Sequence, residues 1–341
     1  MKTTFLTRCV MALMIAGVGF YSCTKSNTGN NSSSGATSTT GLQVAADDQS
    51  QVSYESDAVS DDANTALNGE TTVSGSITEH GTGTITTMGI NQEDSVGAGG
   101  GVIVNNNIIC DASVSYADTN GARTITITYN GANCAGNRTR TGQVIISIPN
   151  GVYWKDPAAA VTVRVVNLTI TRIRDGKVIV INGTKTYTNV TGGLLVDLPN
   201  TDSIVHTITG SMEITFGNGN VRSWSVSKRR VFTYNNGIYL STTGTHSDSL
   251  NHTDVAEWGV NRFGVSFESL ITEPKTIAQS CEFRLTGGQN EVLRSDGWTS
   301  TITYGLDASG DATGCPGTGT YYYKLVVTRP NGLTYTYILP Y

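Results

Sequence analysis

The densest group of residues able to do chemistry lies in the segment Thr245–Asp254, where two His-x-Asp units follow each other. Their four members are His246, Asp248, His252 and Asp254. Residues two apart point to the same side of a strand, so two such units across a hairpin could surround one metal ion. The alternative is a polar hairpin tip in which each aspartate accepts local backbone hydrogen bonds. No residue that would orient the imidazoles can be identified, so the polar tip is preferred.

A second group lies in the expected strand Arg222–Tyr234. Alternation places five aromatic and basic residues on one face, namely Trp224, Lys228, Arg230, Phe232 and Tyr234. Such a face could bind an anionic glycan or a lipid headgroup through cation–π contacts and ion pairs. The commoner alternative is an exposed sheet face with cross-strand pairs. Single-stranded nucleic acid is bound by similar chemistry, but the net charge of −5 argues against that partner.

No catalytic residues are assigned, and no cofactor is expected. Asp202 could pair with His206, but the chain has no G-x-S-x-G nucleophile elbow and too many serines to single one out. An enzyme is therefore the lesser expectation.

The elements that must position these residues are strands. The 341 residues include 39 Gly and 15 Tyr, and only 14% are charged, which argues against a helical bundle and a βαβ enzyme. Alternating segments such as Arg123–Tyr129 recur along the chain, separated by Asn-Gly and Asp-Gly pairs typical of tight hairpins. Asn182-Gly183 is one such predicted turn. The prediction is an all-β domain over residues 69–341, with 14 to 16 antiparallel strands that curl into a barrel-like roll or split into packed sheets.

One helix is predicted over residues 45–68, because Val52, Val59, Ala63 and Ala66 recur near a 3.6-residue period. It is acidic and weakly amphipathic, and is expected to act as a plug or lid on the β-domain. From Ser26 to Ala122 there are twelve acidic residues and no Lys or Arg, whereas the remainder of the chain is basic. The acidic segment could dock on the basic domain, but two separately solvated surfaces are the preferred interpretation.

The N-terminus has the pattern of a secretory signal over residues 1–22, with Lys2 and Arg8 before an apolar run. Phe20-Tyr21-Ser22-Cys23 resembles the lipobox of bacterial lipoproteins, which implies that Cys23 carries the lipid. The alternative is cleavage nearby by an ordinary signal peptidase. Residues 23–44, rich in Ser, Thr, Asn and Gly, are predicted to form a disordered tether.

Four further cysteines remain for an oxidising compartment: Cys110, Cys134, Cys281 and Cys315. Three connectivities are possible. Two similar units, each a cysteine, a strand ending in Ile-Thr-Tyr and a Gly-rich loop with a second cysteine, favour Cys110–Cys134 and Cys281–Cys315.

The run Thr124–Ile146 resembles a segment of uncharacterised lipoproteins of the Bacteroidota, as do Asn182–Thr186, Asn261–Val265 and the cysteine-bounded C-terminal hairpin. The resemblance implies an all-β exported protein without a known activity. We therefore expect an outer-membrane lipoprotein, on the periplasmic face or the cell surface, that binds a glycan or a lipid headgroup. The alternatives are a carrier that encloses an apolar ligand in a lipocalin-like roll, and an envelope hydrolase.

Overall fold

The computed structural model describes residues 39–75, 109–119, 122–133, 136–281, 283–315 and 320–341. All of them belong to one compact unit that spans Ser32–Tyr341. The predicted signal segment, Cys23 and most of the predicted tether lie outside the described residues, and so do Cys134 and residues 76–108.

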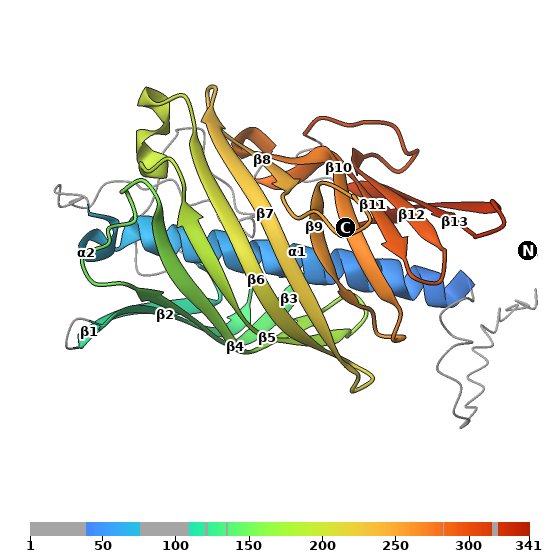
Figure 1. Ribbon diagram of the computed structural model, residues 1–341, viewed down its shortest axis with the longest axis horizontal. Helices are drawn as coiled ribbons and strands as arrows, with labels where there is room; N and C mark the ends of the chain where they lie inside the picture. The colour runs from blue at the N-terminus through green and yellow to red at the C-terminus, as the bar shows by residue number, and fades with distance from the viewer. Residues whose placement is uncertain (1–38, 76–108, 120–121, 134–135, 282, 316–319) are drawn as a thin grey trace, which may run out of the picture. The chain divides into compact units, whose positions relative to one another are not determined.

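The described strands form a single antiparallel sheet of fourteen members, as the sequence predicted (Figure 1). In chain order they are β1 (Ala112–Thr119), β2 (Ala122–Ala132), β3 (Arg138–Ile148), β4 (Ala159–Arg172), β5 (Val178–Asn189), β6 (Ile204–Phe216), β7 (Val221–Tyr234), β8 (Ile238–Gly244), β9 (Val255–Val260), β10 (Ser266–Ala278), β11 (Arg284–Arg294), β12 (Thr299–Leu306), β13 (Tyr322–Thr328) and β14 (Thr334–Pro340). Each strand pairs with the next in the chain, except around β9.

Strands β8 and β9 share one position in the sheet. The C-terminal half of β7 pairs with β8, and its N-terminal half pairs with β9. Strand β10 does the same on the other side, with β9 along its first half and β8 along its second. The segment that joins β8 to β9 therefore begins and ends at the same position in the sheet, between β7 and β10.

Helix α1 (Thr39–Gly69) lies within the curl of this sheet, and Figure 1 shows it in blue crossing the strands. It begins at Thr39 rather than at Ala45, so the last residues of the predicted tether are helical. Most of its residues from Asp48 to Leu67 are buried, including its asparagine and most of its serines and carboxylates. A helix so poor in strong helix formers owes its stability to this burial.

Two local predictions were wrong. Thr71–Ser74 forms the short helix α2 instead of a first strand. Asn182-Gly183 lies in the middle of β5 and makes no turn. A Cβ on Gly183 would lie 2.4 Å from the carbonyl oxygen of Ser211 in β6, so the glycine permits two backbones to approach closely.

The main apolar core lies between α1 and the inward faces of the strands. Alternation supplies it, as in β2, where Ile125, Ile127 and Tyr129 are buried and the residues between them are more exposed. A smaller core surrounds Phe232 and Leu198, the latter in the 3-10 helix η1 (Leu195–Asn200).

Candidate functional site

The interior of the curled sheet is charged as well as apolar. Helix α1 carries six carboxylates and no Lys or Arg, and each carboxylate meets a cation of the sheet or its connections. The pairs are Asp47 with Arg172 and Lys177, Asp48 with Arg262, Glu55 with Arg138, Asp57 with Lys228, Asp61 with Arg230, and Asp62 with Arg140. The interpretation of two separately solvated surfaces was therefore wrong, and the docking alternative describes the molecule.

Strand β7 supplies two of these cations, and its predicted binding face points inward. Trp224, Lys228, Arg230 and Phe232 expose at most 2% of their surface, whereas Tyr234, at the end of the strand, is exposed. The alternation was predicted correctly, but the face is buried against α1 and not open to solvent. Its charges are satisfied by carboxylates of the same chain, which is why a buried strand can carry them.

Glu257 of β9 joins these groups and was missed by sequence reasoning. Its carboxylate accepts hydrogen bonds from Ser53 (2.7 Å), Gln49 (3.2 Å) and Trp224 (3.1 Å), and lies 2.7 Å from Lys228 Nζ. Burial alone would raise the pKa of Glu257, but the ammonium groups of Lys228 and Lys275 outweigh burial and lower it. The only signal in the sequence is a lone acid in an otherwise apolar strand.

A cavity of about 530 Å³ separates part of α1 from the sheet. Among the described residues, β3, β4, β7, β8 and the strands from β10 to β14 contribute to its wall, opposite the helix segment Asp47–Asp57. Its basic lining residues are Arg138, Arg172, Arg174, Arg230, Lys275 and Arg284. Its tyrosines are Tyr54, Tyr304, Tyr323 and Tyr341. Three carboxylates also line it, Asp47, Glu55 and Asp57.

The cavity has an open end and a closed end. Its exposed lining residues are Asn137, Ile173, Arg174, Thr320 and Pro340. Arg174 Nη1 donates a hydrogen bond of 3.2 Å to the Pro340 carbonyl at this open end. Arg230 and Lys275 are buried and mark the closed end. A ligand that enters beside the β4–β5 turn would meet basic groups along its path.

Asp57 lies at the closed end between two ammonium groups. Its carboxylate is 2.6 Å from Lys228 Nζ and 3.8 Å from Lys275 Nζ, and its side chain exposes 20% of its surface. Burial would raise the pKa of Asp57, but these two cations and Arg230 lower it to about 2. Burial lowers the pKa of Lys275 despite the attraction of Asp57. The closed end thus holds fixed charges of both signs next to open space.

Lys185 of β5 is a further buried cation beside this group. Its Nζ donates to the Oγ of Ser56 (2.8 Å) and to the Ser56 carbonyl (3.3 Å). Burial, together with the charge of Lys228, lowers its pKa to about 7. The ammonium group of Lys185 is thus hydrogen-bonded to uncharged oxygens of α1, whereas the neighbouring lysines lie near carboxylates.

The predicted metal cluster is only partly assembled. Asp248 and His252 come together in the β8–β9 connection and are joined by Glu268 of β10, with His252 Nδ1 3.0 Å and 2.9 Å from the two carboxylates. The ring of His246 instead stacks on Trp258, with 4.1 Å between ring centroids, and Asp254 accepts a hydrogen bond from Thr253. Three side chains could thus each offer one ligand atom, but two of the four predicted residues are elsewhere.

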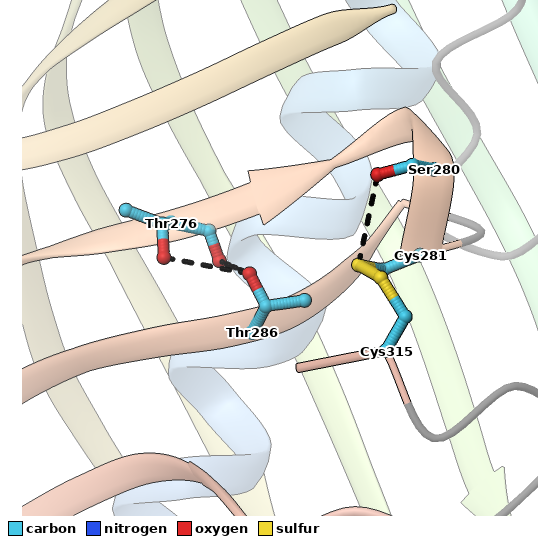
Figure 2. The surroundings of a disulfide bond; sticks show 5 residues. All are labelled: Thr276, Ser280, Cys281, Thr286 and Cys315. Carbon is cyan, nitrogen blue, oxygen red and sulfur yellow. Dashed lines mark hydrogen bonds between the residues drawn. A yellow bond between two sulfur atoms is a disulfide. The ribbon is translucent and has the colours of Figure 1, made fainter. Parts of the chain in front are cut away.

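One predicted disulfide is present. Figure 2 shows Cys281, in the 3-10 helix η2 (Gln279–Cys281), joined to Cys315, beside a hydrogen bond between Thr286 of β11 and Thr276 of β10. Cys110 is also disulfide-bonded. Because Cys134 lies outside the described residues, the Cys110–Cys134 pairing stays a prediction, as does lipidation of Cys23.

No family model matches the chain, and no curated protein or solved structure matches it either. None of the helices in the described ranges is long and apolar enough to cross a membrane.

Proposed function

We propose that this protein is a lipid-anchored binding protein of the cell envelope, and that the cavity between α1 and the sheet takes up an anionic glycan. The observation that carries the proposal is the cavity itself. Its volume of about 530 Å³ is in the range of small-ligand sites, and six basic residues and four tyrosines contribute to its wall. Guanidinium groups suit carboxylates and sulfates, and tyrosine offers both a ring face and a hydroxyl to a sugar.

A glycan fits this lining better than an acyl chain does. Apolar atoms form much of the cavity surface, but they come largely from the stems and rings of basic and tyrosine side chains, beside a few apolar residues such as Ile277 and Leu285. Burying a hydrocarbon against Arg138, Arg230 and Lys275 would leave those charges with less solvation and no new partner. Helix α1 occupies much of the space that a lipocalin-like roll would give to an apolar ligand, and leaves only the cavity beside it. These points favour a polar, charged ligand over the apolar-ligand carrier.

The anchor rests on the sequence alone. The secretory pattern of residues 1–22 ends at Cys23, and the stretch that follows is rich in Ser, Thr and Asn. Mass spectrometry of the mature N-terminus should find Cys23 in first position with acyl chains attached. Cys23→Ala should move the protein from the membrane fraction to the soluble fraction, and an unmodified N-terminus at another residue would remove the anchor from the proposal.

The ligand is tested by offering the mature protein, purified in detergent, to an array of neutral and acidic oligosaccharides and to vesicles with and without anionic lipids. We expect retention of uronate-containing or sulfated oligosaccharides and no retention of neutral ones. Arg174→Met, at the opening, should weaken that binding several-fold because it removes a cation from the path of the ligand.

Arg164→Met is the matched control, because Arg164 is exposed in β4 and does not line the cavity. It should bind like the unmodified protein. Binding to anionic vesicles alone, equal loss in both variants, or no retention of any acidic glycan would each contradict the proposal.

A further inference from the structure

Three residues on neighbouring strands form a row at the closed end of the cavity. Arg230 of β7 is directly opposite Thr242 of β8, and Thr242 is directly opposite Lys275 of β10. Residues opposite each other in antiparallel strands point to the same face, about 5 Å apart. All three line the cavity and expose 5% of their surface or less. A hydroxyl therefore lies between two cations on one buried wall.

The row has unused hydrogen-bond donors. Within the described part of the chain, Arg230 donates one side-chain hydrogen bond, from Nη2 to Asp61. Lys275 Nζ donates to Ser53 Oγ (3.0 Å) and is 3.8 Å from the nearer carboxylate oxygen of Asp57. The hydroxyl of Thr242 has no hydrogen-bond partner among the described residues. These donors line the cavity, where an acceptor of a ligand could reach them.

The two lysines near the row are paired unequally. Lys228 Nζ lies 2.6 Å from Asp57 and 2.7 Å from Glu257, whereas the carboxylate nearest to Lys275 Nζ among the described residues is that of Asp57, at 3.8 Å. Asp57 thus makes its close ion pair with Lys228 and not with Lys275. Lys275 is therefore the cation of the row that lacks a close anionic partner, which an added anion would supply.

We infer that Arg230, Thr242 and Lys275 form the seat for the anionic group of the ligand, which is a carboxylate or sulfate that accepts hydrogen bonds from all three side chains. This inference deepens the proposed function, because it places the acidic substituent of the glycan at the closed end and the sugar rings toward the tyrosines. It also rests on that function only in part, since a seat for an anion can be tested with an inorganic ion.

The first experiment measures binding of inorganic sulfate to the full mature protein in detergent by isothermal titration calorimetry, at constant ionic strength set with chloride. We expect saturable binding of one sulfate per chain. Lys275→Met should weaken it at least tenfold because it removes a charge, and Thr242→Val should weaken it about fivefold because it removes one donor with little change in volume.

Arg229→Met is the matched control, since Arg229 is next to Arg230 in β7 and is exposed on the opposite face. It should bind sulfate like the unmodified protein. Circular dichroism identifies any variant that fails to fold. If Lys275→Met fails to fold, sulfate binding by Thr242→Val still tests the proposed seat. No sulfate binding, or binding that Thr242→Val and Lys275→Met leave unchanged, overturns the seat.

A second experiment compares a glucuronate-containing disaccharide with its neutral counterpart on the same variants. A preference for the acidic sugar that disappears in Lys275→Met supports both the seat and the proposed function. Sulfate binding without binding of either sugar keeps the seat and contradicts the glycan. Acidic-sugar binding that Lys275→Met and Thr242→Val do not alter keeps the glycan and contradicts the seat.

Discussion

Arg140 of β3 donates a hydrogen bond of 2.8 Å to Asp62 of α1, and neither side chain exposes more than 2% of its surface. The same guanidinium donates two further hydrogen bonds of 2.6 Å to Asp111. One cation is therefore shared by two buried carboxylates, one on the helix and one just before β1. This pair shows how the sheet holds α1, and it leads to the first prediction.

Arg140→Met should lower the free energy of unfolding by about 3–5 kcal/mol, because it leaves both carboxylates buried without a cation. Asp62→Asn should cost less, since Arg140 keeps Asp111. Urea denaturation followed by circular dichroism measures both. Arg164→Met, on an exposed position of β4, should change stability by less than about 0.5 kcal/mol. A loss below 1 kcal/mol in Arg140→Met would contradict the importance of this contact.

His206 should make the protein less stable in mild acid. Its ring is buried between Trp154 and Phe232, and burial, assisted by the charge of Arg230, lowers its pKa to about 3. The unfolded chain, in which the pKa is about 6.5, binds more protons between these values, so stability contributed by neutral His206 is lost as pH falls from 6.5 toward 3.

His206→Phe should remove this part of the pH dependence, which is on the order of 4 kcal/mol across the interval. Denaturation midpoints at a series of pH values provide the measurement. The unmodified protein and His206→Phe contain the same carboxylates, whose titration also changes stability. The difference between their two curves of stability against pH therefore reports the titration of His206. Parallel curves would show that the folded-state pKa is not lowered.

The Cys281–Cys315 bridge should contribute roughly 4 kcal/mol to stability, because it closes a loop over a separation of 34 residues. The double variant Cys281→Ser/Cys315→Ser should show this loss in urea. Non-reducing peptide mapping of the unmodified protein should recover a Cys281–Cys315 peptide and a Cys110–Cys134 peptide. A Cys110–Cys315 link would contradict both pairings.

His252 should titrate above its ordinary pKa of about 6.5, because its ring is hydrogen-bonded to Glu268 and attracted by Asp248. Glu268→Gln should lower the pKa of His252, and Asp254→Asn, whose side chain lies apart from this group, should leave it unchanged. Proton NMR of the imidazole resonances follows both. Zinc added to the same sample should shift the His252 signal only if the three side chains bind the metal together.

The strands could be predicted from the sequence because their cause is local. In β2, alternation alone identifies Ile125, Ile127 and Tyr129 as inward residues, and Asn-Gly and Asp-Gly pairs mark many of the hairpins. Asn182-Gly183 misled for a physical reason, since a glycine also serves where two backbones approach closely. Strands without clear alternation, such as β9, were not predicted.

The charged interior could not be predicted in the same way. Alternation correctly placed Lys228 and Arg230 with Trp224, but lysine and arginine ordinarily lie outside. Their burial depends on Asp57 and Asp61, which are 171 and 169 residues away along the chain. The acidic helix and the basic strands were both visible in the sequence, yet only tertiary structure shows that each is the counterion of the other.

The position of α1 near the start of the chain affects when the protein can complete its fold. Helix α1 precedes every described strand in the chain. Its Asp48 contacts Arg262 and its Ser53 contacts Lys275, which lie 214 and 222 residues further along the chain. The ion pair of Asp48 can form only after Arg262, just before β10, has been made, and the hydrogen bond between Lys275 and Ser53 only after β10 has been made. The fold therefore cannot be completed strand by strand as the chain emerges. Such distant contacts slow folding. They also favour a chain that remains unfolded until most of it has been synthesised.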